Sequence, residues 1–359
     1  MRIIQLIDSL EAGGAERMAV SYANALAEEI EFSALVVTRK EGPLLNQIEP
    51  KVSYLFLNKK RTIDFKAIYS LRSFAKKNKV TIIHAHSTSF FLAFLVKVTF
   101  PSIQLIWHDH YGDSEFLGKR PTLALRLLMP YFKGIIAVNH NLQIWSKQEL
   151  KSKNVIYLPN FPSNEKKVAS KTFLKGITGK RILCLANLRA QKNHFLLLDV
   201  AKKLKESHPE WTFHLVGKDF EDLYSQKIKN RIVTFDLEKN VFLYGTKDDV
   251  GNIIEQSNIG ILTSDSEGLP VSLLEYGWHK KAVVVTKVGE VSSLVTNESN
   301  GFLVEVRQTQ LFYESVVKLI LNETLRNDFG IALYNAVVKN NSEETILKQY
   351  LNWLQNVYK

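Results

Sequence analysis

Short apolar runs alternate with longer amphipathic segments along almost the whole chain. The runs at 3–7 and 32–37 are rich in aliphatic side chains, which is typical of strands buried in a parallel sheet. The segments at 15–27 and 65–78 show the spacing of amphipathic helices. This alternation predicts parallel sheets flanked by helices, an α/β fold. Further strands are predicted at 52–57, 81–84, 104–108, 134–138, 155–158, 181–186, 212–216, 241–244, 259–263 and 282–286.

The alternation is interrupted once, near the middle of the chain. A Pro-Asn-Phe-Pro-Ser-Asn run begins at Pro159, and polar sequence continues to Lys180, which is typical of an interdomain connection. With 359 residues the chain is too long for one ordinary core. The pattern therefore predicts two Rossmann-like domains, at 1–162 and 181–340, joined by a linker at 163–180. The segment from 308 onward is predicted to be helical, with an amphipathic final helix at 341–359.

Cysteine usage and hydropathy indicate a cytoplasmic protein. Cys184 is the only cysteine, which excludes an intramolecular disulfide and fits a reducing compartment. It stands in an apolar run, so we expect a buried strand position rather than a nucleophile. The N-terminus lacks the pattern of a signal peptide. The longest apolar stretch, 90–100, is about half of what a membrane span needs and contains Lys97, so no transmembrane helix is predicted.

The formal net charge of +11 suits nucleic acid, anionic lipid or phosphorylated substrates. Because the charges are scattered and no nucleic-acid-binding module is recognisable, we expect no nucleic-acid partner. Basic clusters at 59–61 and 119–120 fall in the same half of the chain as aromatic-rich segments, which suits peripheral docking on the anionic inner face of the plasma membrane. Solvated helix faces or loops are the competing explanation for the basic clusters, and buried helix packing explains the aromatic segments equally well.

Two carboxylates eight positions apart, Glu267 and Glu275, are the most informative feature of the sequence. Pro270 suits the first turn of a helix that follows the predicted strand at 259–263, so both carboxylates are expected at the carboxyl edge of a sheet. The first amides of that helix would attract phosphate, and ionised carboxylates accept hydrogen bonds from sugar hydroxyls. The competing explanation is that Glu is simply favourable near a helix N-terminus.

Cations follow the first strand of the second half, at Arg189 and Lys192. A cleaved sugar–phosphate bond leaves negative charge on the diphosphate, which a metal ion or fixed cations must stabilise. The sequence shows no convincing metal-ligand cluster, so we predict a metal-independent site without a cofactor. In the first half, Gly13 and Gly14 follow the first strand, and His108 and His110 follow another. Two close histidines without a third partner make a poor zinc site.

The segment from Ser264 to Glu275 resembles the donor-site signature of retaining glycosyltransferases with the GT-B fold, the large family-4 group. The Gly-Gly-Ala-Glu-Arg run at Gly13 is similar to a stretch of the same family. The resemblance implies two Rossmann-like domains facing across a cleft, with the final helix packing back toward the first. It implies metal-independent, retaining transfer of a hexosyl-type sugar from a nucleotide-sugar donor. The acceptor would be a glycan or a polyprenyl- or lipid-linked saccharide in cell-surface polysaccharide biosynthesis.

The resemblance also implies roles for individual residues. Glu275 would bind ribose hydroxyls, Glu267 sugar hydroxyls and Lys192 the diphosphate. Asn187 stands where the family usually has Arg, so Arg189 is expected to substitute for it. Catalytic roles fall to Glu267 and to His108, which would contact the transferred sugar. The other implied positions are donor-binding Gly217, Gly268, Leu269, Val271 and Ser272, and cleft-lining Gly13, Gly14 and His110.

Other interpretations stay open at this stage. One is a GT-B sugar-nucleotide epimerase or phosphorylase, which would act without a carbohydrate acceptor. Another is a basic nucleic-acid-binding protein, which would bind any duplex with steep salt dependence. A two-domain dehydrogenase is weaker, because the Gly-x-Gly-x-x-Gly fingerprint is absent.

Overall fold

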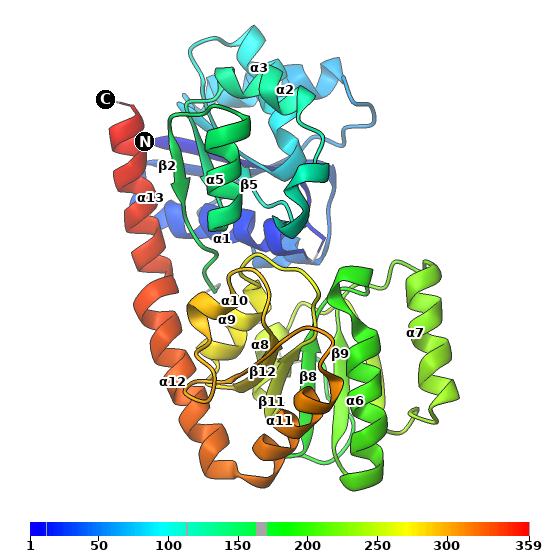
Figure 1. Ribbon diagram of the computed structural model, residues 1–359. Coiled ribbons are helices and arrows are strands. Elements are labelled where there is room, and N and C mark those ends of the chain that lie inside the picture. Colours follow the sequence, from blue (N-terminus) through cyan, green and yellow to red (C-terminus); the bar gives the residue numbers. More distant parts are fainter. Residues whose placement is uncertain (12, 113, 163–170, 359) are drawn as a thin grey trace. The chain divides into compact units, whose positions relative to one another are not determined.

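The computed structural model describes residues 1–11, 13–112, 114–162 and 171–358, which divide into two compact units (Figure 1). Unit 1 comprises Met1–Asn164 and Glu343–Lys359, and unit 2 comprises Glu165–Ser342. Most of the predicted linker's first half, 163–170, lies outside the described residues. Lys171 and Thr172 follow it, and their backbone N–H groups donate to the Asp249 carboxylate of unit 2 at 2.8 and 2.7 Å.

Unit 1 is built on a seven-stranded parallel sheet with the order β3-β2-β1-β4-β5-β6-β7. The order reverses between β1 and β4, because the chain first builds outward in one direction and then returns to the other side of β1. The strands are β1 (Arg2–Ser9), β2 (Phe32–Lys40), β3 (Ser53–Phe56), β4 (Ile82–His86), β5 (Gln104–Asp109), β6 (Gly134–Ala137) and β7 (Val155–Tyr157).

Helices flank this sheet, and the last helix of the chain is one of them (Figure 1). The C-terminal helix α13 belongs to unit 1, where its Tyr350 ring packs edge-on against Tyr22 of α1 at 5.2 Å between centroids. The helices of unit 1 are α1 (Gly14–Glu29), α2 (Phe65–Lys77), α3 (Phe90–Thr99), α4 (Leu123–Leu128), α5 (His140–Glu149) and α13 (Glu343–Val357).

Unit 2 repeats the same plan with a six-stranded parallel sheet in the order β10-β9-β8-β11-β12-β13. Its order reverses between β8 and β11. The strands are β8 (Arg181–Leu185), β9 (Thr212–Val216), β10 (Val241–Gly245), β11 (Ile259–Leu262), β12 (Ala282–Thr286) and β13 (Phe302–Val304). The helices are α6 (His194–Ser207), α7 (Leu223–Thr234), α8 (Val250–Glu255), α9 (Val271–Trp278), α10 (Val291–Leu294), α11 (Thr309–Leu321) and α12 (Glu323–Asn341).

The α/β fold of two Rossmann-like units is confirmed. Cys184 is a buried strand residue as predicted, and burial raises the pKa of its thiol to about 12, which removes it as a nucleophile. The helical end of the chain is also as expected, although it is divided into α11, α12 and α13. Among the described helices, none combines the length and the apolar character that crossing a bilayer requires.

Candidate functional site

In each sheet, the residues predicted to bind substrate follow the strands between which the strand order reverses. Loops that follow two strands on either side of such a reversal diverge, and the space between their carboxyl ends is where open α/β sheets bind ligands. In unit 2 the reversal lies between β8 and β11, and Lys192 and Glu267 follow these two strands. In unit 1 it lies between β1, which Gly13 follows, and β4, which ends at His86.

Lys192 and Glu267 form an ion pair at this edge of unit 2. Glu267 is 6% exposed, and its Oε1 also accepts a hydrogen bond from the Ser264 hydroxyl at 2.7 Å. Charge-assisted bonds of this kind fix the carboxylate in one orientation. The chain therefore brings together the cation and the carboxylate that the sequence predicted for one ligand.

The loops after β8 and β11 are also tied directly to each other. The Thr263 hydroxyl donates to the Lys192 carbonyl at 3.0 Å, and the Asp265 amide N–H donates to the Gln191 carbonyl at 2.8 Å. Asn193, in the left-handed region at φ 45°, caps α6 and donates to the Asp265 carboxylate at 2.9 Å. These bonds hold Lys192 beside Glu267 without a ligand.

Helix α9 carries Glu275, which is 6% exposed. The helix is anchored to β8 by Tyr276, whose hydroxyl donates to the Leu183 carbonyl at 3.0 Å and accepts from the Leu185 amide at 2.8 Å. Pro270 lies at the N-cap, one position before the first turn that the sequence predicted. The sequence predicted that the first amides of this helix, those of Val271, Ser272 and Leu273, attract phosphate. The Leu273 amide already donates to the Pro270 carbonyl at 3.1 Å, so it is occupied.

Val271 and Ser272, the other two amide positions, are the first two residues of α9. Gly268 and Leu269 precede them in the loop, and the Gly268 carbonyl accepts from the Glu290 amide at 3.1 Å. Gly289, with φ +50°, lies against this loop so closely that a Cβ there would be 2.0 Å from the Glu267 carbonyl oxygen. Only glycine fits this contact. Gly289 was not predicted from the sequence, where its one signal is a glycine after a strand.

Arg189 does not join the Lys192–Glu267 pair. Its guanidinium lies over the Phe220 ring at 4.6 Å from the centroid, a cation–π contact with the loop after β9. Asn187, at the usual Arg position, instead accepts a hydrogen bond from the Lys218 amide at 2.7 Å. The structure thus shows a loop-bridging contact for Asn187 and a stacking contact for Arg189.

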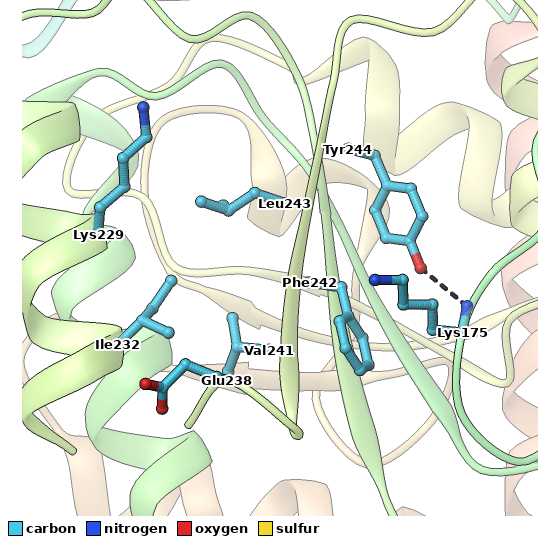
Figure 2. A pocket seen from close by; sticks show the side chains of 8 residues that line it. All are labelled: Lys175, Lys229, Ile232, Glu238, Val241, Phe242, Leu243 and Tyr244. Carbon is cyan, nitrogen blue, oxygen red and sulfur yellow. Dashed lines mark hydrogen bonds between the residues drawn. The ribbon is translucent and has the colours of Figure 1, made fainter. Parts of the chain in front are cut away.

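Gly217 lines a cavity of about 250 Å³ with Gly245, between the ends of β8, β9 and β10. A Cβ at Gly217 would be 2.2 Å from the Ala186 carbonyl oxygen, so glycine is needed where these loops meet. A second cavity, of about 320 Å³, lies along the outer strand β10 and α7 (Figure 2). Its lining includes Phe242 and Tyr244 but none of the predicted donor residues, so we do not assign the donor site to it.

In unit 1, Gly13 is the N-cap of α1 and Gly14 its first residue. A Cβ at Gly13 would meet the end of the Glu16 side chain, which itself accepts a hydrogen bond from Ser9 at 3.2 Å. The two glycines therefore lie at the carboxyl edge of the sheet next to polar side chains, with Glu16 crossing over Gly13.

Four histidines gather at the same edge of unit 1. Strand alternation turns His84 and His86 to one face of β4, and His86 pairs in register with His108 of β5. His84 Nε2 lies 3.2 Å from His108 Nδ1, and His86 Nδ1 lies 3.0 Å from His110 Nε2. Burial lowers the pKa of His84, His86 and His108 well below the usual value, and that of His110 to about 3, so the four rings are neutral at physiological pH.

Three of these rings, His84, His86 and His108, offer nitrogen atoms within 4.8 Å of one another, the spacing from which a metal ion can be ligated. Their nitrogens face each other in pairs, however, and the His84 and His86 rings are stacked at 20° between planes. A metal ligand needs its lone pair, which lies in the ring plane, to point at the ion, so stacked rings would have to turn before they shared one. All four histidines were predicted from the sequence to lie at or just beyond strands of this sheet. The expectation that no third histidine accompanies a close pair is wrong, because the strand register places His84 and His86 beside His108.

Comparison with known proteins gives a consistent result over both units. A family described as glycosyl transferases group 1 matches residues 165–336, and one described as glycosyltransferase family 4 matches residues 12–161.

Several relatives match most of the chain, among them two bacterial proteins. An uncharacterized glycosyltransferase of Haemophilus influenzae is 26% identical over 88% of this chain and 88% of its own. The Escherichia coli UDP-Gal:α-D-GlcNAc-diphosphoundecaprenol α-1,3-galactosyltransferase is 24% identical over 90% of this chain and 88% of its own. Among solved structures, HepE from Anabaena in complex with UDP and glucose superposes with a TM-score of 0.82 at 18% identity, covering 99% of each chain.

Proposed function

The chain belongs to the GT-B glycosyltransferases of group 1, and on that premise we propose a more specific activity. It is a glycosyltransferase of glycan or polysaccharide biosynthesis. We propose that it transfers a hexosyl group from a nucleotide sugar with retention of configuration and without a metal ion. The acceptor we propose is a saccharide carried on a lipid diphosphate.

The observation that carries this proposal is the ion pair of Lys192 with Glu267 at the strand-order reversal of unit 2. In the proposed complex, Lys192 turns its ammonium group to the donor diphosphate. Glu267, still held by Ser264, accepts hydrogen bonds from sugar hydroxyls. Glu275 on α9 accepts from the ribose hydroxyls, and the amides of Val271 and Ser272 bind phosphate oxygens.

Fixed positive charge supports the proposed metal independence. As the sugar–phosphate bond breaks, negative charge develops on the leaving diphosphate, and an ammonium group held at the site stabilises that charge in place of a metal ion. Lys192 is only partly exposed and is tied in place through its backbone carbonyl to Thr263. Arg189 would assist only by leaving the Phe220 ring, so we assign the main charge stabilisation to Lys192.

The donor we propose is a UDP-hexose. Two findings support the uridine base: the Escherichia coli relative is named as a UDP-Gal-dependent galactosyltransferase, and the Anabaena structure contains UDP. The cavity that Gly217 and Gly245 line is adjacent to the loop after β8 and is a candidate for the base. The relative's name also supports a lipid-diphosphate acceptor.

Such an acceptor is embedded in a bilayer, and we propose that unit 1 docks on the anionic inner face of the plasma membrane. From 65 to 108 the chain has six Lys and Arg residues and no Asp or Glu. On α2 the Phe65 and Tyr69 side chains are 81% and 69% exposed, one turn apart, beside the exposed Lys66. Exposed aromatic side chains beside Lys and Arg residues, in a segment without acidic residues, are typical of a helix that binds an anionic membrane surface.

Transfer from UDP-hexoses to a synthetic lipid-diphosphate saccharide, in EDTA, tests the activity. The expected product keeps the donor's anomeric configuration, as read by NMR. Lys192→Ala is expected to lower kcat by roughly 10²–10³-fold, the loss typical of one preorganised charge-stabilising group. Lys287→Ala, which removes an exposed lysine paired with Glu305, is the matched control and should change kcat less than twofold. An inverted product, or activity abolished by EDTA, would contradict the proposed mechanism.

A further inference from the structure

Three side chains of unit 1 form a hydrogen-bonded chain from the sheet interior to its carboxyl edge. Gln5 on β1 and His86 at the end of β4 are both fully buried, with Gln5 Oε1 2.8 Å from His86 Nε2. His86 Nδ1 lies 3.0 Å from Nε2 of His110, whose side chain is partly exposed just beyond β5. The His86 and His110 ring planes differ by 19° and their centroids are 5.2 Å apart, so the two rings are nearly parallel at the distance of a ring-to-ring hydrogen bond.

The chemistry of the Gln5 oxygen determines where the protons lie. With the Gln5 amide assigned so that its Oε1 faces His86, the Nε2 of His86 carries the proton and donates it, since an amide oxygen only accepts. A neutral imidazole has only one N–H group, so His86 Nδ1 is unprotonated and its lone pair can accept a hydrogen bond. That lone pair accepts from His110, so His110 carries its own proton on Nε2. The Nδ1 of His110 is then unprotonated too. Within the described part of the chain, this nitrogen makes no hydrogen bond to any residue.

We propose that Gln5 and His86 are positioning residues that hold His110 in its Nε2–H tautomer, so that Nδ1 accepts a hydrogen bond from a hydroxyl of the saccharide acceptor. This inference rests on the proposed function and deepens it by naming the group that the edge of unit 1 recognises. A neutral acceptor nitrogen selects for hydroxyls. An ionised phosphate oxygen has no proton to donate and would face a lone pair, so the diphosphate of either substrate is disfavoured at this position.

For the neighbouring His108, the hydrogen-bond partners do not determine which ring nitrogen carries the proton. Its Nδ1 faces His84, whose other nitrogen lies 3.1 Å from the Tyr350 hydroxyl. Because a hydroxyl both donates and accepts, this second chain is compatible with either direction of its protons. In the His86–His110 chain, the Gln5 amide oxygen takes the place of the Tyr350 hydroxyl. Because this oxygen can only accept, all hydrogen bonds of that chain donate in one direction, from His110 toward Gln5.

The tautomers are directly measurable by ¹H–¹⁵N correlation of the full-length protein labelled with ¹⁵N-histidine. His86→Asn and His110→Asn identify the two sets of signals. The expected result at pH 7.5 is a neutral ring with Nε2 protonated at both positions. A proton on Nδ1 of His110, or a charged ring, would overturn the proposal. So would a metal ion retained after purification together with loss of the Nε2–H signals, because the rings would then be ligands.

Kinetics test the positioning role separately. Gln5→Met keeps the length of the side chain but removes the acceptor, so it should raise the KM for the saccharide acceptor roughly 5- to 10-fold, the value of one neutral hydrogen bond. The KM for the donor should stay within twofold. Gln5→Glu, at pH 8, restores an acceptor atom and should restore the acceptor KM. Gln104→Met, on β5 of the same sheet, is the matched control and should leave both constants unchanged.

These outcomes separate the inference from the function on which it rests. Absence of transfer from every nucleotide sugar would remove the proposed function, while the NMR spectra would still decide the tautomer of His110. A correct tautomer with an unchanged acceptor KM in Gln5→Met would overturn the positioning role alone.

Discussion

Glu267 owes its position to neighbours from three separate segments of unit 2. Lys192 and Ser264 hold its carboxylate, and Gly289 packs against its backbone. The proximity of Lys192 and Glu267 was predictable, because both follow strands whose carboxyl ends share one sheet edge. The stacking of Arg189 on Phe220 was not, because the ring comes from the loop after another strand and nothing in the local sequence indicates its direction.

The contact at Gly289 leads to a specific prediction. In Gly289→Ala the new Cβ would lie 2.0 Å from the Glu267 carbonyl oxygen, and the φ of +50° is unfavourable for alanine. The loop must shift, so we expect a loss of about 2 kcal/mol or more in unfolding free energy, together with weaker donor binding. Urea unfolding and nucleotide titration measure the two effects.

Gly179→Ala is the control for backbone strain alone, because Gly179 also has a positive φ but no atom within 4 Å of the added Cβ. It should lose less stability and keep full donor affinity. Equal donor affinity in the two variants would show that Gly289 does not position the Glu267 loop.

Helix α2 presents an unusual face for a helix on a sheet. Its buried side is ordinary, with Ala67, Leu71 and Ala75 in the core of unit 1. Its exposed side carries Phe65 and Tyr69, which a solvated helix would avoid. The helix itself was predictable from its periodicity. Which aromatics it exposes was not, because the spacing of apolar residues on both faces leaves the buried side undecided until the neighbouring elements are in place.

Replacing Phe65 and Tyr69 by serine should reduce binding to vesicles of anionic lipid at least fivefold, since each exposed aromatic contributes interfacial burial. Co-sedimentation at 0.1 M salt measures it. Serine at Leu223 and Val233, two similarly exposed apolar residues of α7 in unit 2, is the matched control. Equal binding by both double variants, or equal binding to neutral and anionic vesicles, would contradict docking through α2.

Among the other elements, β13 and α7 were not predicted from the sequence. The strand β13 has only three residues and pairs with β12 alone, so its local pattern is too short to stand out. Helix α7 exposes Leu223 and Val233, which blurs the apolar stripe by which amphipathic helices are recognised. Both failures have the same cause, because these peripheral elements are specified more by their neighbours than by their own periodicity.

For the whole molecule, the two halves of the sequence produce two sheets whose strand orders reverse at equivalent places. The alternation of strand and helix patterns was sufficient to predict this architecture. Periodicity was not sufficient to assign α13 to unit 1, because the helix is far in sequence from the strands it covers, and only the family resemblance implied it. All residues proposed for the donor belong to unit 2, so we predict one nucleotide site whose residues are close together in that unit.

That site is tested most directly by thermal-shift melting with UDP-, GDP- and ADP-sugars and their free nucleotides, all in EDTA. A ligand at 100 times its Kd stabilises the folded state by about 2.7 kcal/mol, enough to raise Tm by several degrees. We predict such a rise with the uridine compounds, lost in Glu275→Ala and kept in Glu305→Ala, where the replaced carboxylate is an exposed partner of Lys287. A flat response across the panel, or a rise that requires a divalent metal, would contradict the metal-free donor site.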